Sequence, residues 1–179
     1  MLNGDTSIEG NNDKKIVLFP GQLIVSKDEK IIWTLLGSCI SIIFYNKRTQ
    51  LSAVCHAQLP AKNEKLTCKE SCPNPCGMNE YDNDFRYVTC SFKHMLSLFN
   101  KSGIQKSEIE VSLYGGSAMF DLGKDTLNIG NKNIQKAKDL IRRNNLRIIN
   151  EDIGGTLSRT ITYFSKTGKI ELKINPPSK

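Results

Sequence analysis

The chain has 179 residues, of which 39% are hydrophobic and 24% charged, and this balance is typical of one globular domain. No apolar run is long enough to span a bilayer, and residues 1–15 lack the apolar segment of a secretory signal. We therefore expect a cytoplasmic protein with a flexible tail at 1–15 and a single domain over 16–179. The net charge of +7 comes from scattered lysines without interleaved aromatic residues, which argues against nucleic acid and fits an acidic protein partner better.

The predicted elements are mostly short strands. Runs rich in β-branched and aromatic residues, bounded by turn residues, predict strands at 16–19, 22–26, 30–36, 40–45, 50–58, 108–114, 146–150, 159–164 and 169–174. Apolar residues at helical spacing predict helices at 85–99 and 131–145, the first capped by Asn83 or Asp84. Residues 61–83 have no periodicity and are interpreted as a long loop. The mixture predicts an α+β fold with two main helices.

Cys39 directly precedes the predicted hairpin formed by the strands at 40–45 and 50–58, and His56 lies in its second strand. If a four-residue loop at 46–49 joins these strands, Tyr45 faces Gln50 and Cys39 falls directly opposite His56 on the same face. A one-residue slip would instead put Cys55 in that place. In the first register, a thiol and an imidazole can share a proton.

This pairing suits nucleophilic catalysis. A thiol becomes a strong nucleophile when a neighbouring imidazole takes its proton, and the imidazole can later protonate a leaving amine. Thr34 lies just upstream and could orient the ring, while Gly37 and Ser38 could turn the backbone so that N–H groups face a developing oxyanion. The alternative is structural, because free cysteines and strand histidines are often simply packed.

Several motifs occur in a definite order along the chain. They are TLLGSC (34–39) with ISIIFY (40–45), HAQLP (56–60), YGGSAMF (114–120), NIGNKN (128–133) and EDIGG (151–155) followed by Arg159, with Pro20-Gly21 upstream. In this combination, from about Val17 to about Leu172, the sequence resembles the CheD family of chemoreceptor glutamine deamidases.

The resemblance implies a function and a fold. It implies that Cys39 is the nucleophile, His56 the base and Thr34 the residue that orients the base. The implied reaction converts receptor glutamines to glutamates through a thioester and releases ammonia, without a metal or organic cofactor. The implied fold is the layered α/β/β/α arrangement of cysteine hydrolases with mixed sheets.

Three features leave alternatives open. Gly115 and Gly116 are either turn residues or part of a substrate groove. The loop at 61–83 is longer than the resemblance leads us to expect. It holds Cys68, Cys72 and Cys76, which together with Cys90 are either free thiols or a metal site of unusual spacing.

The resemblance also leaves the function open in part. The alternative to a receptor deamidase is a regulatory binding module for a CheC-type phosphatase or for chemoreceptors, with catalysis secondary. A third possibility is a thiol hydrolase of the same fold that acts on another amide.

Overall fold

The computed structural model describes residues 15–61, 84–118 and 128–176. Its strands are β1 (Lys15–Val17), β2 (Leu23–Ser26), β3 (Ile31–Leu36), β4 (Ile40–Asn46), β5 (Leu51–Cys55), β6 (Glu110–Gly115), β7 (Arg147–Ile153), β8 (Arg159–Phe164) and β9 (Lys169–Ile174). Its helices are α1 (Val88–Lys101) and α2 (Ile129–Arg143), with short 3-10 turns at Asp84–Arg86 and Lys106–Glu108.

A five-stranded sheet in the order β2-β5-β4-β6-β7 forms the centre of the molecule. β4 pairs antiparallel with both β5 and β6, whereas β7 lies parallel to β6 at the edge. Every residue of β4 and β5 is buried. This burial on both faces explains why the two strands read as nearly continuous apolar runs rather than as alternating ones.

A four-stranded sheet in the order β1-β3-β8-β9 packs against one face of the first sheet. Its central strand β3 alternates between the two environments, with Ile32, Thr34 and Leu36 buried while Trp33 and Leu35 are exposed. The alternation follows from the two-residue period of a strand. Thr34 therefore points into the layer between the sheets.

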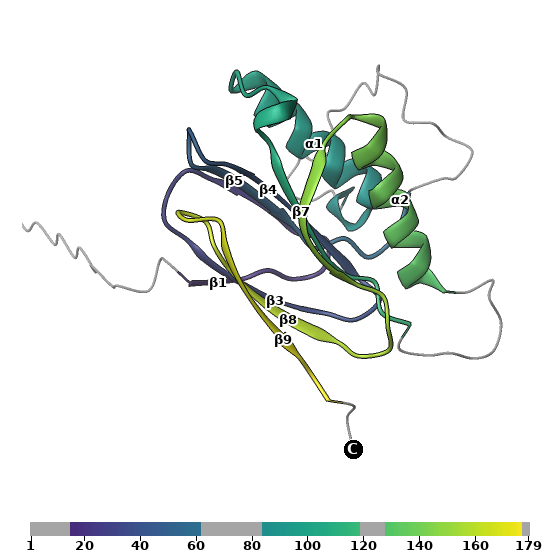
Figure 1. Ribbon diagram of the computed structural model, residues 1–179. Helices are drawn as coiled ribbons and strands as arrows, with labels where there is room; N and C mark the ends of the chain where they lie inside the picture. The colour runs from purple at the N-terminus through teal and green to yellow at the C-terminus, as the bar shows by residue number, and fades with distance from the viewer. Residues whose placement is uncertain (1–14, 62–83, 119–127, 177–179) are drawn as a thin grey trace, which may run out of the picture.

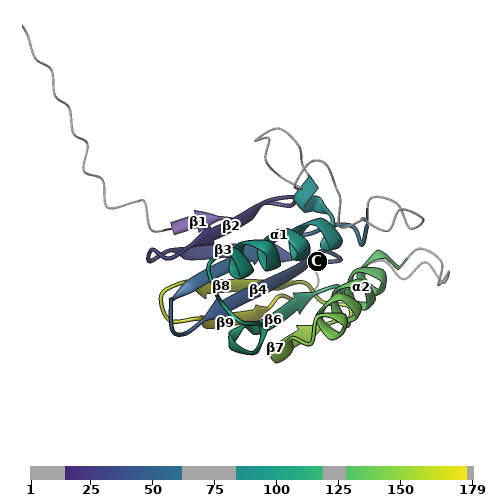
Figure 2. The ribbon, with the colours of Figure 1, turned by 90° about the horizontal axis from the view of Figure 1, so that it is seen from above.

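Both helices cover the other face of the five-stranded sheet, as Figures 1 and 2 show. Phe44 of β4 meets Phe92 and Phe99 of α1 edge to face, at centroid distances of 5.4 and 5.6 Å. Ala137 and Ile141 bring α2 into the same core. The described residues thus form three layers: helices, five-stranded sheet and four-stranded sheet.

A second apolar cluster fills the space between the two sheets. Ile43 and Val54 contribute to it from the five-stranded sheet, and Leu36 and Tyr163 from the four-stranded sheet. Cys39 is partly buried and packs against this cluster. The inter-sheet layer is therefore where the predicted catalytic residues lie.

The predicted α+β class, with mixed sheets and two main helices, is confirmed, and each predicted strand overlaps an observed one. A second helical layer, on the outer face of the four-stranded sheet, is not found in the described part of the chain. The predicted capping of the first helix by Asp84 was wrong. Asp84 belongs to a 3-10 turn, and α1 begins after Tyr87, whose side chain makes no capping bond.

The predicted tail and loop can be placed only at their margins. Lys15, which the sequence assigned to the tail, belongs to β1. Residues 1–14 and 62–83, as well as Asn83 as a cap, lie outside the described residues.

Candidate active site

Thr34 and His56 meet between the two sheets. Thr34 of β3 is fully buried, and His56, which directly follows β5, is 2% exposed. The Thr34 Oγ1 atom lies 2.7 Å from His56 Nδ1 and also donates a hydrogen bond to the Leu18 carbonyl oxygen at 2.7 Å. Two residues that are distant in sequence are therefore joined by a hydrogen bond across the sheet interface.

These contacts define the tautomer of His56. The Leu18 carbonyl can only accept, so it takes the single hydroxyl proton of Thr34. Nδ1–H then donates to Thr34 Oγ1, with the Leu18 oxygen 3.3 Å away as a weaker second acceptor. The lone pair of the ring is left on Nε2, which is buried and has no hydrogen-bond partner among the described residues.

The register of the β4–β5 hairpin differs from the predicted one. Tyr45 pairs with Ser52 rather than with Gln50, and Ile40 forms a bridge with Ala57. His56 consequently lies opposite Ser41, and the expected direct pairing with Cys39 was wrong. The turn occupies positions 47–50, with Gln50 in the left-handed region at φ 56°.

The shift nevertheless keeps Cys39 and His56 on one face. A displacement of two residues is a full strand period, so residues that shared a face still share it. Cys39 is a diagonal neighbour of His56, and the Cα atoms of such neighbours lie about 7–8 Å apart. Cys39 is also only partly buried, so its thiol can be approached from outside while the imidazole is enclosed.

Burial shifts the pKa values of His56 and Cys39 in the directions that favour the neutral forms of both side chains. It lowers the pKa of His56 below the usual histidine value, with the Leu18 carbonyl opposing the shift. It raises the pKa of the Cys39 thiol, with the residue's own backbone N–H opposing. Near neutrality the two groups are therefore a thiol and an uncharged imidazole, so any nucleophilic attack by this thiol would require its proton to move to a base.

The carbonyl groups of residues 37–39 all accept hydrogen bonds from neighbouring elements. Gly37 accepts from the Ser117 N–H at 2.8 Å, and Cys39 accepts from the Gly116 N–H at 2.7 Å. Ser38 accepts from the side-chain amide of Asn133 at 3.0 Å. No acceptor on another described residue takes the backbone N–H of Ser38 or of Cys39.

Gly115 and Gly116 fit closely beneath this segment. A side chain on Gly115 would overlap the Cys39 carbonyl oxygen, and one on Gly116 would overlap Ile134 of α2. Both glycines have positive φ angles, 105° and 71°, which side chains rarely adopt. The Gly116 N–H is already bonded to the Cys39 carbonyl, so it is not a free donor.

Arg159 ties the neighbouring turns together. Its guanidinium group is buried, forms an ion pair with Asp152, and donates to Ser117 Oγ at 2.6 Å and to the Gly154 carbonyl at 2.8 Å. Ser117 in turn holds Gly37. The EDIGG and arginine motifs thus support the backbone next to Cys39.

The other cysteines have different surroundings. Cys55 is fully buried in the core between the sheet and the helices, and burial raises its pKa to about 11. Cys90 is buried in α1, whereas Cys68, Cys72 and Cys76 lie outside the described residues. Within the described ranges no group of three or more metal-binding side chains is found.

Asn133 is the residue that the sequence analysis missed. The sequence analysis gave it no role beyond the NIGNKN motif (128–133), whose first residue, Asn128, caps α2 by accepting from the Asn131 N–H. The available signal was a polar residue on the apolar face of α2, one turn before Ala137. Asn133 is fully buried.

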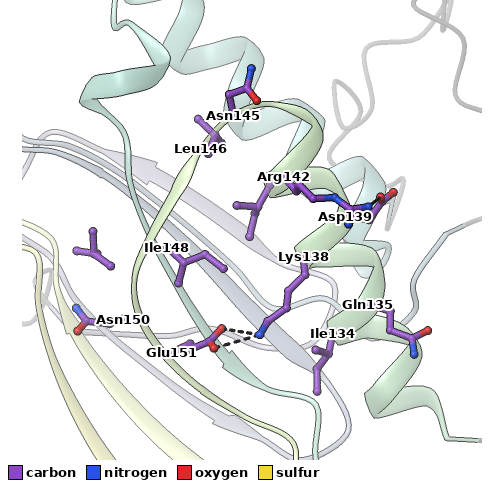
Figure 3. Close-up of a pocket in the computed structure, with 12 residues that line it drawn as sticks. Ile134, Gln135, Lys138, Asp139, Arg142, Asn145, Leu146, Ile148, Asn150 and Glu151 are labelled. Atoms are coloured by element: carbon purple, nitrogen blue, oxygen red, sulfur yellow. Dashed lines mark hydrogen bonds and ion pairs between the residues drawn. The ribbon is translucent and has the colours of Figure 1, made fainter.

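A groove of about 980 Å³ runs between α2 and β7 (Figure 3). Ile134 and Ile148 contribute to its lining, and Lys138 and Glu151 form an ion pair across it. It contains none of the predicted catalytic side chains. The predicted catalytic residues therefore lie in the inter-sheet layer and not in this groove.

Comparison with known proteins agrees with the motifs. The family model for CheD chemotactic sensory transduction matches residues 73–174, more than half of the chain. A relative from Methanococcus maripaludis is 34% identical over 84% of this chain and 88% of its own length. The chain belongs to the CheD family.

The CheD relatives carry consistent names. The protein from Methanococcus maripaludis and one from Pyrococcus horikoshii, 32% identical over 89% of this chain and 92% of its own, are named "Probable chemoreceptor glutamine deamidase CheD". One from Geobacter sulfurreducens, 28% identical over 88% of both chains, is named "Probable chemoreceptor glutamine deamidase CheD 2". These names support the assignment of this chain as an amidohydrolase.

In this CheD-family chain, no described helix combines the length and apolar character needed to cross a bilayer.

Proposed function

We propose that this protein is a protein-glutamine deamidase that converts specific glutamines of chemoreceptors to glutamates, with Cys39 as the nucleophile. The observation that carries the proposal is the buried Leu18–Thr34–His56 hydrogen-bond chain, which leaves the His56 Nε2 lone pair unengaged on the same face as the accessible Cys39. The names of the relatives supply the substrate class.

The reaction has two halves. In the first, the Cys39 sulfur attacks the carboxamide carbon while Nε2 of His56 takes the thiol proton. The carbon–nitrogen bond then breaks, and His56 returns the proton to the leaving nitrogen as ammonia forms. In the second half, water gives a proton to His56 and attacks the thioester. The carbon–sulfur bond breaks, the thiol is restored and glutamate is released.

Thr34 keeps the ring in the reactive tautomer through both halves. Its oxygen accepts from Nδ1–H in the neutral ring and remains an acceptor when the ring is protonated. The backbone N–H groups of Ser38 and Cys39 are the candidates for stabilising the oxyanion, because the carbonyl groups of this segment are bonded and no other described residue accepts from these N–H groups. Gly115 and Gly116 support that backbone from beneath.

Cys39→Ala and Cys55→Ala make a matched test. Both remove one thiol, but Cys55 faces the helices on the opposite side of the sheet. Incubated with purified chemoreceptor signalling domains, the wild type and Cys55→Ala should release ammonia, with glutamine-to-glutamate conversion located by mass spectrometry. Cys39→Ala should release none.

Two results would count against the proposal. Equal ammonia release by Cys39→Ala would exclude Cys39 as the nucleophile. No release from the folded wild type with several receptors would favour the regulatory binding module, which binding to chemoreceptors or to a CheC-type phosphatase would then test.

A further inference from the structure

Asn133 bonds the backbone near each member of the proposed catalytic pair through one side-chain amide. Its Nδ2 atom donates to the Ser38 carbonyl at 3.0 Å and to the Gln58 carbonyl at 2.9 Å. Ser38 directly precedes Cys39, and Gln58 is two residues beyond His56. The orientation of the amide is unambiguous, because two carbonyl oxygens can face only its N–H₂ end.

Close packing of α2 against the Gly116 backbone fixes the position of the Asn133 side chain. Gly130, one turn earlier on the same face of α2, lies against the Gly116 backbone so closely that a side chain there would overlap the Gly116 carbonyl oxygen. Neighbouring backbone atoms leave α2 little room to shift. The Asn133 amide therefore extends from α2 into the space between the segment at 37–39 and the residues that follow β5.

The β ladder does not itself make this connection. The last β4–β5 bridge joins Ile40 to Ala57. Beyond it, the chains that carry Ser38 and Gln58 have no backbone hydrogen bond to each other. The Asn133 amide takes the place of the missing ladder bond, so it sets the separation at the point where Cys39 projects.

Asn133 also carries an unusual polar atom. Its Oδ1 is buried and has no hydrogen-bond partner among the described residues. Buried acceptors without a partner are rare, and each one in a native protein calls for an explanation. Leucine or alanine at this position would avoid the orphaned acceptor but could not donate to either carbonyl.

We propose that Asn133 is a positioning residue that holds Cys39 at the distance and angle from which His56 can take its proton. The inference rests on the proposed function, since it assumes that these two residues act as a pair. Asn133 touches neither the thiol nor the imidazole in any hydrogen bond and acts through the backbone on each side.

The test measures Cys39 itself and needs no receptor. Iodoacetamide alkylation would be followed from neutral to alkaline pH under reducing conditions, and the Cys39 peptide quantified by mass spectrometry to separate it from the other cysteines. His56→Gln should slow alkylation at neutral pH by about tenfold or more, because the thiol then has no base. Asn133→Ala should slow it by a similar factor, since a displacement of about 1 Å between reacting groups can cost about a hundredfold. In both variants, alkylation should approach the wild-type rate at alkaline pH, where the thiol ionises without a base.

Ile141→Ala is the matched control. It removes a buried side chain from the same helix, about two turns beyond Asn133, and touches neither carbonyl. Its alkylation profile should stay within about twofold of the wild type even where its unfolding free energy falls as much as that of Asn133→Ala. If Asn133→Ala does not fold, Asn133→Ser keeps one donor and should show a smaller change in the same direction.

The outcomes separate the two proposals. A normal profile for Asn133→Ala beside an altered one for His56→Gln would overturn the role of Asn133 and leave the catalytic pair intact. Equal losses in Asn133→Ala and Ile141→Ala at equal stability would also overturn it, because the effect would then be structural. A normal profile for His56→Gln would refute the catalytic pair, and the inference about Asn133 with it.

Discussion

Replacing Thr34 by valine removes one oxygen from the inter-sheet layer and nearly preserves its shape. The hydroxyl makes two hydrogen bonds of 2.7 Å, one accepted from His56 Nδ1–H and one donated to the Leu18 carbonyl. Without it, Nδ1–H keeps only the 3.3 Å contact to Leu18. The ring then loses the contact that favours the tautomer with a free Nε2.

The expected magnitudes follow from these contacts. Two buried neutral hydrogen bonds contribute about 1 kcal/mol each to stability, so Thr34→Val should lower the unfolding free energy by about 2 kcal/mol. For a domain of this size that corresponds to a melting temperature lower by roughly 4–8 °C. Loss of a charged orienting residue can cost about 10⁴-fold in turnover; for a neutral hydroxyl we expect about ten- to a hundredfold.

Thr34→Ser provides the comparison, because it keeps the hydroxyl and loses only a methyl group. Ammonia release from a receptor domain, Cys39 alkylation at neutral pH and thermal unfolding would be measured on both variants. Thr34→Ser should remain within a few-fold of the wild type in both rates. If Thr34→Val kept wild-type turnover and alkylation while losing stability, the hydroxyl would be structural and the orienting role would be refuted.

Two further predictions concern pH and the glycine turn. Burial lowers the pKa of His56 in the folded protein below 6.5, its value in the unfolded chain. As the pH falls below 6.5, the unfolded chain therefore binds more protons than the folded one. The contribution of His56 to stability is complete above pH 6.5 and is lost as the pH falls toward the folded pKa. Urea denaturation should therefore show a steeper acid loss of unfolding free energy in the wild type than in His56→Gln, and equal slopes would contradict the shift. Gly115→Ala would force a side chain against the Cys39 carbonyl at φ 105°, so this variant should lose both stability and Cys39 reactivity. Gly155 has φ 68° but open space around it. Gly155→Ala should therefore lower the unfolding free energy by only about 1–2 kcal/mol and leave Cys39 reactivity intact. Similar alkylation rates in these two variants would show that the Gly115 contact does not position the nucleophile.

Much of the fold could be read from the sequence because the signals are local. Strand runs such as 40–45 and the helical spacing of 131–145 are properties of neighbouring residues, and both elements form where predicted. The order of the motifs also identified the family, since spacing along a chain is visible without a structure.

Local patterns could not assign strands to sheets. β2 and β3 are separated by a short polar turn, yet β2 pairs with β5 and β3 with β8. The choice depends on which faces can be buried together, and it is this separation that brings Thr34 to His56 from the opposite sheet. The family resemblance implied the role of Thr34, but periodicity alone gave no reason for the contact.

The β4–β5 hairpin could be predicted from the sequence only in part, and the tertiary structure decided the rest. The sequence predicted that Cys39 and His56 share a face but left open a one-residue slip that would separate them; the observed register differs by two residues, which keeps them on one face. Only the tertiary structure decided the register itself, through the turn at 47–50 and the pairing of β4 with both neighbours. The positioning by Asn133 was likewise decided by packing, because it depends on α2 lying against the Gly116 backbone, a contact between residues that no local pattern connects.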